Sequence, residues 1–326
     1  MNNSGNNLKI LVIRIGRMGD RVMITPAFRA LLEAYPSAEF HLLTSTDGKR
    51  VFSRFSKRIT ACRVHNRKGL LEKVRLRRIL GRIRRTGYDH IFCFELNPTF
   101  KPFYMAAQNG GYCIDRTRPE AHYSRRCLDV VTRATDKPMD NYWLNFPVSE
   151  EARIKSRSLL TAVGIDDSTF VVGMHPTYSG VKKMPWRRKM DAGRRWPAGN
   201  FAQLATQLLA HAEKHQIPLC ILLDLLPEEA KIGNEIIRLS QGGITMITPQ
   251  PDFQRYAATL QRMNLLVTPD TGPMHIGGAV GTRLVTLFAN KNPMDCSAYI
   301  PPEHCAVVQS PSRNIADIHP HDVMAE

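Results

Sequence analysis

Residues 265–288 decide the fold of this chain, and they read Leu265-Leu-Val-Thr-Pro-Asp-Thr-Gly-Pro-Met-His-Ile-Gly-Gly-Ala-Val-Gly-Thr-Arg-Leu-Val-Thr-Leu-Phe288. The apolar start, 265–267, predicts a buried strand, and 284–288 predict a second strand. Between them, the small residues at 274–280 predict a short helix, which Gly281 ends because glycine readily adopts the left-handed conformation. The stretch therefore predicts a βαβ unit, the building block of parallel sheets in α/β proteins.

The turn between the first strand and the helix has the residues of a phosphate-binding site. Thr271 is expected to cap the helix, and Pro273 suits its first turn, where the missing N–H costs nothing. Gly272 lets the backbone come close to a ligand. A helix that begins just beyond the carboxyl end of a strand presents N–H groups and a positive dipole end. The turn therefore predicts binding of an anion such as a phosphate group.

The opening of the chain repeats this order of elements. Residues 8–15 are an apolar, β-branched run that predicts a buried parallel strand, and 16–20 form the loop after it. Thr25 and Pro26 predict the N-cap and first residue of a helix. Residues 39–44 predict the next strand. Strand, loop, helix and strand in this order are typical of the start of a doubly wound sheet.

The second half of the chain shows the same alternation. Helices are predicted at 150–162, 201–214 and 252–263, and strands at 170–174 and 218–223. The fold class is therefore α/β, with two Rossmann-like, doubly wound domains.

A domain boundary is expected near the middle of the chain. Residues 141–148 look like an exit strand that leads to a linker. We expect a first domain over 1–148 and a second over 149–326, sizes that are ordinary for domains. The proline-containing tail after Ala289 is a candidate for crossing back to pack on the first domain.

The composition indicates a protein without disulfides or membrane spans. Seven cysteines lie singly, with no Cys-x-x-Cys pair, which argues against a disulfide framework or a zinc site and suits a reducing cytoplasm. The polar N-terminus lacks a signal region, and no stretch approaches the ~20 apolar residues that cross a bilayer. We therefore expect a cytoplasmic protein, at most peripheral on the inner face of the inner membrane.

The formal net charge of +16 predicts an anionic partner, which can be nucleic acid, anionic lipid or a phosphorylated or carboxylated substrate. Residues 49–85 are densely basic, and Glu72 is the only acid between Arg67 and Arg85. Apolar residues at helical spacing in the later part predict an amphipathic helix with a cationic face. Such a face is usually only solvated, but the shortage of acids favours an anionic partner such as a membrane surface.

Several absences argue against a cofactor or a metal. The first loop lacks the Gly-x-Gly-x-x-Gly spacing of a dinucleotide fingerprint. His211 and His215 lie four residues apart without a third ligand, so we expect surface histidines. The chain contains no Asp-x-Asp motif that would hold a divalent ion. We therefore expect no cofactor and no metal site.

Three segments resemble glycosyltransferase family nine, the ADP-heptose:lipopolysaccharide heptosyltransferases. The turn Asp-Thr-Gly-Pro-Met-His at 270–275, before a glycine-rich helix, resembles the signature segment of the family. Residues 15–27, Ile-Gly-Arg-Met-Gly-Asp-Arg-Val-Met-Ile-Thr-Pro-Ala, resemble its N-terminal motif. Arg194-Arg195-Trp196-Pro197 resembles its Lys-x-Trp-Pro segment. The resemblance covers nearly the whole chain and implies the GT-B arrangement, in which two Rossmann-like domains face a cleft.

The resemblance implies a diphosphate site in the second domain. In the family, the cation of Lys-x-Trp-Pro contacts the donor diphosphate, and Arg194 is at that position, with Trp196 as a packing residue. Arginine keeps the positive charge of lysine, but its planar guanidinium replaces a compact point charge. Arg195 is the alternative candidate for contacting the diphosphate. The N–H groups and helix dipole of the signature turn are expected to bind the same diphosphate. The residues of the turn are Thr271, Gly272 and Pro273.

Three further side chains are candidates for binding the donor. Asp270 is expected to bind hydroxyls of the sugar. His275, in the first turn of the helix, either contacts phosphate or is a buried structural residue. Glu228 is a candidate for contact with the ribose, although the loop at 224–229 lacks the glycine that the family usually has there.

The resemblance also implies an acceptor site in the first domain. The aspartate of the family's Gly-Asp motif is the proposed catalytic base, and Asp20 matches it, although the local sequence alone favours a salt-bridged or capping residue. Basic residues of this domain are expected to bind the carboxylates and phosphates of a Kdo-bearing lipid, without individual matches to family positions. The candidates are Arg17, Arg50, Arg54, Lys57 and Arg58.

The expected function is an inverting, metal-independent transfer of heptose from ADP-heptose to the Kdo/heptose inner core of lipopolysaccharide. Asp20 would accept the proton of the attacking hydroxyl. One alternative is a transferase or epimerase for another nucleotide sugar, because fold does not fix chemistry. The other is a basic nucleic-acid-binding protein, which leaves the turn motifs unexplained. The expected partners are ADP-heptose, an anionic lipid-linked acceptor and the inner-membrane surface, and not nucleic acid.

Overall fold

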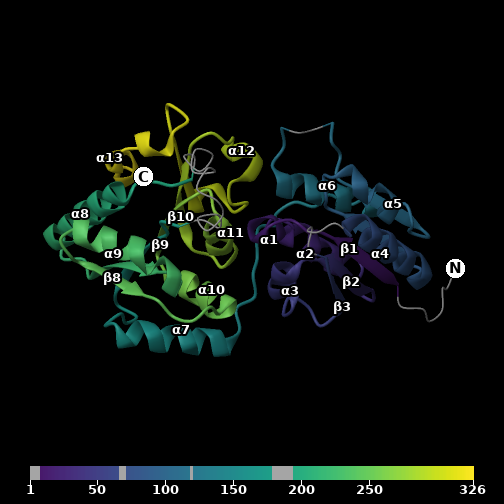
Figure 1. Ribbon diagram of the computed structural model, residues 1–326, viewed down its shortest axis with the longest axis horizontal. Helices are drawn as coiled ribbons and strands as arrows, with labels where there is room; N and C mark the ends of the chain where they lie inside the picture. The colour runs from purple at the N-terminus through teal and green to yellow at the C-terminus, as the bar shows by residue number, and fades with distance from the viewer. Residues whose placement is uncertain (1–7, 66–70, 118–119, 178–193) are drawn as a thin grey trace. The chain divides into compact units, whose positions relative to one another are not determined.

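The computed structural model describes residues 8–65, 71–117, 120–177 and 194–326, and the structural statements below concern these residues. The chain divides into two compact units, Met1–Phe146 and Pro147–Glu326. Each unit contains one fully parallel sheet against which helices pack (Figure 1). The α/β class with two Rossmann-like sheets is therefore confirmed.

The first sheet has five strands in the order β3-β2-β1-β4-β5. The strands are β1 (Lys9–Ile13), β2 (Glu39–Thr44), β3 (Ile59–Val64), β4 (His90–Cys93) and β5 (Gly110–Cys113). The helices are α1 (Met18–Val22), α2 (Thr25–Ala34), α3 (Thr46–Phe52), α4 (Glu72–Thr86), α5 (Lys101–Tyr104) and α6 (Tyr123–Thr135). Residues 10–13 of the central strand β1 are fully buried, as expected for a parallel strand covered on both faces.

The second sheet has six strands in the order β11-β10-β9-β6-β7-β8. The strands are β6 (Phe170–Met174), β7 (Leu219–Asp224), β8 (Ile244–Ile247), β9 (Leu265–Pro269), β10 (Arg283–Phe288) and β11 (Cys305–Gln309). The helices are α7 (Glu150–Ala162), α8 (Ala198–Lys214), α9 (Ala230–Leu239), α10 (Phe253–Arg262), α11 (Gly272–Ala279), α12 (Pro293–Cys296) and α13 (Pro320–Met324).

Both sheets have the strand order of a nucleotide-binding fold. Counted from β6, the second sheet runs 3-2-1-4-5-6, and the first sheet runs 3-2-1-4-5. The order reverses between β1 and β4 in one sheet and between β6 and β9 in the other. Loops that leave the carboxyl ends of such a strand pair diverge, which opens the crevice where these folds bind ligands. Side chains that follow β1, β4, β6 and β9 therefore lie at the ligand edge of their sheet.

The structure differs from the sequence prediction at two places in the first unit. Residues 141–148 form no strand, and the Asn145 N–H donates to the hydroxyl of Thr25 at 3.1 Å instead of to a neighbouring strand. Thr25 is the first residue of α2 and not its cap, because its own hydroxyl donates to the carbonyl oxygen of Val22 at 2.7 Å. The predicted loop at 16–20 contains the start of the short helix α1.

The tail after Ala289 contributes to the core of the second unit, whereas the sequence made it a candidate for packing on the first. Strand β11 pairs in parallel with β10, and Ile315, Ile318 and Val323 belong to the apolar core of this unit. The indole N–H of Trp196 donates to the carbonyl oxygen of Ile318 at 2.9 Å. Trp196 is buried, so it has the packing role that the sequence predicts.

Candidate active site

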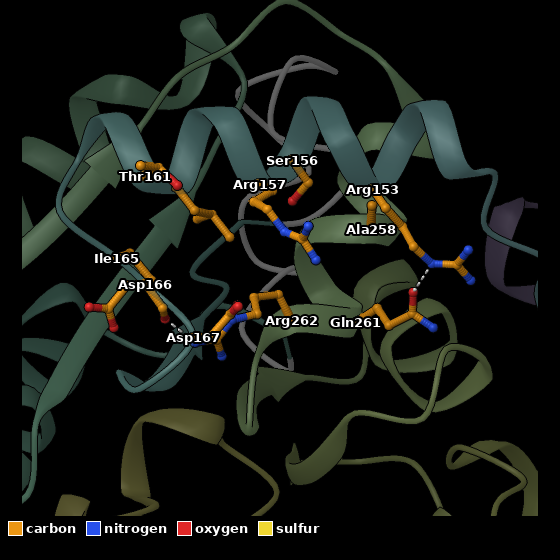
Figure 2. A pocket seen from close by; sticks show the side chains of 11 residues that line it. Arg153, Ser156, Arg157, Thr161, Ile165, Asp166, Asp167, Ala258, Gln261 and Arg262 are labelled. Carbon is orange, nitrogen blue, oxygen red and sulfur yellow. Dashed lines mark hydrogen bonds between the residues drawn. The ribbon is translucent and has the colours of Figure 1, made fainter.

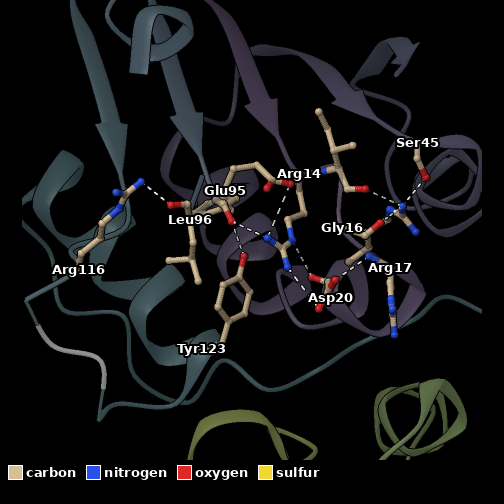
Figure 3. Close-up of polar contacts among 12 residues, drawn as sticks. Arg14, Gly16, Arg17, Asp20, Ser45, Glu95, Leu96, Arg116 and Tyr123 are labelled. Atoms are coloured by element: carbon tan, nitrogen blue, oxygen red, sulfur yellow. Dashed lines mark hydrogen bonds and ion pairs between the residues drawn. The ribbon is translucent and has the colours of Figure 1, made fainter. Parts of the chain in front are cut away.

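A buried arginine joins the strands at the switch point of the first sheet (Figure 3). Arg14 follows β1, and its guanidinium donates to the carbonyl oxygen of Phe94, just after β4, at 3.0 Å. Its Nη1 lies 3.7 Å from Oε1 of Glu95, and its Nη2 lies 3.4 Å from Oδ1 of Asp20. The guanidinium carbon lies 4.7 Å from the centroid of the Tyr123 ring. Arg14 therefore connects both strand ends to the helix that carries Asp20.

Asp20 lies on α1 and is held from two sides. Its Oδ2 accepts from the backbone N–H of Arg17 at 2.6 Å, while its Oδ1 faces Arg14. A Cβ added at Gly16 would clash with the Asp20 carboxylate, so glycine is needed beside it. The Asp20 side chain is nevertheless 34% exposed. The carboxylate is thus both oriented and accessible, as a general base must be.

A second buried arginine fixes the loop before Asp20. The Nη2 of Arg21 donates to the carbonyl oxygen of Ile15 at 2.9 Å, and also to the carbonyl of Gly16 and the hydroxyl of Ser45. Its Nη1 lies 3.7 Å from Oδ2 of Asp47. Burial lowers the pKa of Arg21, and the Asp47 carboxylate opposes this effect. Side-chain contacts therefore hold the loop between β1 and α1 in place.

Burial and ion pairing act in opposite directions on Arg14. Burial lowers its pKa, but Tyr123, Asp20 and Glu95 raise it, and the resulting pKa lies above the ordinary value for arginine. Burial also raises the pKa of Tyr123, so its hydroxyl stays protonated and donates to the carbonyl oxygen of Phe94. The cluster therefore contains one permanent positive charge between two carboxyl groups.

In the second unit, the buried Asp270 pairs with two cations at the carboxyl end of β9. The Nζ of Lys291, which follows β10, lies 2.8 Å from Oδ2 of Asp270. The Nη2 of Arg194 donates to the same oxygen at 3.1 Å. The side chains of Arg194 and Lys291 are 29% and 44% exposed, so both reach solvent. Two cations on one carboxylate leave a net positive charge that suits an anionic ligand.

Helix α11 begins directly after Asp270. Thr271 is its N-cap residue, but the hydroxyl of Thr271 lies 3.1 Å from that of Thr268 and makes no capping hydrogen bond. The side chain of Thr271 thus leaves the first N–H groups of the helix available to a ligand. A Cβ added at Gly272 would meet nothing within 4 Å, so there is open space at the start of the helix. Pro273 lies in the first turn as predicted.

Two histidines lie near this edge of the second sheet. His275 is buried within α11. His175 follows β6, and its Nδ1 lies 3.3 Å from the hydroxyl of Tyr256, while its Nε2 lies 3.1 Å from Oγ1 of Thr177. Burial lowers the pKa of His175 to about 4, so this ring is neutral near pH 7. His175 and Thr177 both follow β6, so this pair of polar side chains lies at the carboxyl edge of the second sheet.

The remaining donor candidates are exposed. Arg195 is exposed, whereas its neighbour Trp196 is buried and Arg194 contacts Asp270. Glu228 is exposed in the 3₁₀ turn 227–229 after β7. The end of β7 also holds a buried ion pair between Asp224 and Arg255. Burial raises the pKa of Asp224 to about 6, although Arg255 opposes this shift.

The acceptor candidates of the first unit lie at different places. Arg17 is exposed next to Asp20. Arg50 lies on α3, and its Nη1 is 3.8 Å from Oδ1 of Asp47. Arg54 is exposed after the end of α3.

Lys57 and Arg58 directly precede β3. They therefore lie at the amino ends of the strands, opposite the carboxyl edge where Asp20 lies. Arg58 donates to the carbonyl oxygens of Leu32 at 2.5 Å, Tyr35 at 2.6 Å and Pro36 at 3.0 Å. These bonds satisfy carbonyl groups at the C-terminal end of α2. Arg58 therefore has a structural role at the end of α2, whereas the resemblance made it a candidate for binding the acceptor.

A cavity of about 400 Å³ lies in the first unit, where β4 and β5 end. Its lining includes Glu95, Lys101, Arg116 and Arg133. Glu95 also contacts Arg14, so the cavity adjoins the Asp20 cluster. Figure 3 shows Arg116 donating to the carbonyl oxygen of Leu96 at this edge.

A cavity of about 280 Å³ lies between α7 and α10 in the second unit (Figure 2). Its charged lining residues include Arg153, Arg157 and Arg262. Helix α7 leads into β6, and α10 leads into β9, so Arg262 at the end of α10 lies at the amino edge of the sheet. This cavity is therefore separate from the Asp270 edge.

Sequence reasoning missed Arg14, Glu95 and Lys291 as members of these clusters. Arg14 and Glu95 are single charged residues directly after an apolar strand run. Both follow strands between which the strand order reverses. A charged residue directly after each of two such strands is the sequence signal that predicts a site there. Lys291 has no comparable signal in its neighbourhood.

Within the described ranges, no group of three or more His, Cys, Asp and Glu side chains is arranged to hold a metal ion. None of the described helices is long and apolar enough to cross a membrane.

Comparisons with known proteins identify the family. A model described as glycosyltransferase family 9 (heptosyltransferase) matches residues 54–317. Lipopolysaccharide heptosyltransferase 2 of Salmonella typhimurium is 24% identical over 314 residues, which cover 88% of this chain and 84% of that protein.

Solved structures agree on the fold. A family 9 glycosyl transferase from Veillonella parvula has a TM-score of 0.78 and 18% identity, and the match covers 98% of this chain and 95% of that one. The E. coli ADP-heptose lps heptosyltransferase II has a TM-score of 0.70 and 17% identity, covering 98% of this chain and 97% of that one. At these identities the structures establish the GT-B type of fold, and the family match establishes a glycosyltransferase in place of an epimerase or a nucleic-acid-binding protein. This chain belongs to glycosyltransferase family 9, the heptosyltransferase family.

Proposed function

We propose that the protein transfers heptose from ADP-heptose to the Kdo/heptose inner core of lipopolysaccharide, with inversion at the anomeric carbon. Family membership, a relative named lipopolysaccharide heptosyltransferase 2 and a structural neighbour whose name includes ADP-heptose support this proposal. The observation that carries it is the placement of Asp270, Arg194 and Lys291 beside the start of α11. A cationic helix start at the switch point is where doubly wound folds bind nucleotide phosphates.

The donor diphosphate is proposed to bind at the start of α11. The N–H groups that follow Thr271 and the open space at Gly272 allow phosphate oxygens to come close. Arg194 and Lys291 supply positive charge there, and Asp270 keeps both cations in position. These groups stabilise the negative charge that develops on the leaving diphosphate, so the proposed route needs no divalent metal.

Asp20 is proposed to act as the general base. Its carboxylate takes the proton of the acceptor hydroxyl, and the hydroxyl oxygen forms a bond to the anomeric carbon. The bond from that carbon to the diphosphate oxygen breaks, and ADP leaves with the electron pair. Arg14 and the Arg17 N–H are proposed as positioning groups, because both contact the Asp20 carboxylate.

The acceptor is proposed to bind at the carboxyl edge of the first sheet. The cavity lined by Lys101, Arg116 and Arg133 adjoins Glu95 and carries cations for carboxylates or phosphates of the acceptor. Arg17 is exposed at the same edge. Lys57 and Arg58 are left out of the proposed acceptor set, because they precede β3 at the opposite edge.

Adjacent arginines provide a matched test of the donor site. We expect Arg194→Ala to weaken ADP binding about tenfold, since a charge-assisted contact contributes roughly 1.4 kcal/mol or more. Arg195→Ala, the same change one residue away on an exposed side chain, should leave ADP affinity unchanged. Isothermal titration calorimetry measures both. Equal losses in the two variants would show that Arg194 has no special role.

The proposed substrate pair has a direct test. Wild-type protein is incubated with ADP-heptose and a Kdo-bearing lipid, and mass spectrometry detects whether the lipid gains one heptosyl unit. Parallel reactions with UDP- and GDP-sugars report donor choice. Transfer from a UDP- or GDP-sugar with none from ADP-heptose would contradict the proposal.

A further inference from the structure

Helix α4 carries a dense positive charge that the proposed reaction does not use. Residues 48–88 contain fifteen Lys and Arg and a single acid, Glu72. Seven of these cations lie on α4, and all seven are exposed. They are Lys73, Arg75, Arg77, Arg78, Arg82, Arg84 and Arg85. Exposed helices usually place acids one turn from such cations, so this composition points to an anionic partner outside the chain.

Two exposed apolar residues lie among these cations at the start of α4. Leu76 and Ile83 are the buried residues of α4, and they face the core of the first unit. At about 3.6 residues per turn, Val74 and Gly81 lie on the opposite side of the helix. Val74 is 41% exposed, and Leu71 at the N-cap is 59% exposed. Arg78 and Arg85 follow on the same side, so exposed apolar side chains at the start of the helix lie next to basic ones, a combination that suits the surface of an anionic bilayer.

We propose that the exposed face of α4 docks on an anionic lipid bilayer. The basic side chains contact lipid phosphates, and Leu71 and Val74 enter the headgroup region. α4 begins at the carboxyl edge of the first sheet, because it follows β3, and the loop that leads to Asp20 on α1 leaves from the same edge. The inference rests on the proposed function in one respect: docking would bring a lipid-carried acceptor to that edge.

Nucleic acid is the competing anionic partner. Phosphate contacts alone would need the cations but not the exposed apolar residues between them. Leu71 and Val74 therefore favour a bilayer over a duplex, and the experiment includes both.

The test measures binding of the full chain to vesicles by co-sedimentation, without any substrate. Vesicles are made of phosphatidylcholine with or without phosphatidylglycerol. The α4 variant combines Arg78→Gln, Arg82→Gln and Arg85→Gln. The control combines Lys214→Gln, Lys231→Gln and Arg238→Gln, which are exposed cations of α8 and α9, so both variants lose the same charge.

We expect wild type and the control to bind only the anionic vesicles. Each cation near an anionic surface contributes roughly fivefold to partitioning, so the α4 variant should bind about a hundredfold more weakly. Val74→Ser should weaken binding without a change in charge. Equal binding by the α4 variant and the control, with both folded by circular dichroism, would overturn the proposal. Tighter binding to duplex DNA than to anionic vesicles, lost in the α4 variant, would also overturn it. Because no donor or acceptor is present, either result is independent of the transferase assay.

Discussion

A buried arginine such as Arg14 needs partners for every part of its guanidinium. Moving a charge out of water costs several kcal/mol unless ion pairs and hydrogen bonds offset it. Asp20, Glu95 and the carbonyl oxygen of Phe94 provide that compensation. The result is a rigid link between two strand ends and a carboxylate, which gives Asp20 a defined orientation without enclosing it.

His175 gives a pH-dependent contribution to stability. Its pKa is about 4 in the folded protein, against an ordinary value of 6.5, because burial disfavours the charged ring. Between these values the unfolded chain binds a proton that the folded protein does not, so stability falls as the pH falls from about 6.5 to about 4. The loss is at most about 3 kcal/mol.

His175→Gln should flatten this part of the pH dependence, since glutamine does not titrate. Urea unfolding of wild type and variant at pH values on both sides of this range measures the difference in free energy of unfolding. Asp224 and the high net charge affect both proteins equally, so they cancel in the comparison. Identical pH dependence in the two proteins would contradict the role of His175.

Whether a site residue could be predicted from the sequence depended on whether its partners are close to it in the chain. Asp270 and Thr271 are in a motif whose chemistry is visible in a few neighbouring residues. Asp20 is a candidate base only through the family motif, because its neighbours alone favour a salt-bridged or capping residue, and its contacts with Arg14 and Arg17 are of that kind. Arg14 and Glu95 meet only because β1 and β4 are adjacent in the sheet, which the sequence does not show before the strand order is known. Arg58 was an acceptor candidate because the resemblance points to basic residues without identifying them, and the sequence does not show that its guanidinium donates to carbonyl groups at the end of a helix.

At the scale of elements, substitutions at two glycines of α11 distinguish an effect on ligand binding from an effect on packing. Gly272→Ala places a methyl group in open space, so the fold should tolerate it, while ADP affinity falls about tenfold because the methyl stands where phosphate is proposed to approach. A Cβ at Gly277 would lie 3.0 Å from Leu266 and 3.2 Å from Leu284, so Gly277→Ala should cost about 1–3 kcal/mol of stability.

Calorimetry with ADP and thermal unfolding of both variants provide the measurements. The expected pattern is weak binding with normal stability for Gly272→Ala, and normal binding with reduced stability for Gly277→Ala. Normal ADP affinity in Gly272→Ala would argue against phosphate at the start of α11.

Elements with a strong local pattern had predictable bounds, as β2, α7 and β6 show. The segment 141–148 has apolar residues at alternate positions, and Leu144 and Phe146 are indeed buried. Alternation reports burial on one side of an extended chain, and it does not report whether a neighbouring strand is present. That is why the pattern predicted a strand where the structure has none.

At the scale of the whole molecule, each unit holds one part of the proposed chemistry. The first unit contains the oriented carboxylate of Asp20, and the second contains the cationic helix start at Asp270. The family match begins at residue 54, so it covers the second group and not the first. The assignment of Asp20 therefore rests on its motif and on its contacts with Arg14 and Arg17.

The most direct test compares wild type with Asp20→Asn in two assays on the same preparations. Heptosyl transfer from ADP-heptose should fall by about a hundredfold or more, because asparagine cannot accept the proton. Binding of ADP, measured by calorimetry, should be unchanged, because the second unit alone is proposed to hold it. Transfer at the wild-type rate by Asp20→Asn would contradict the account.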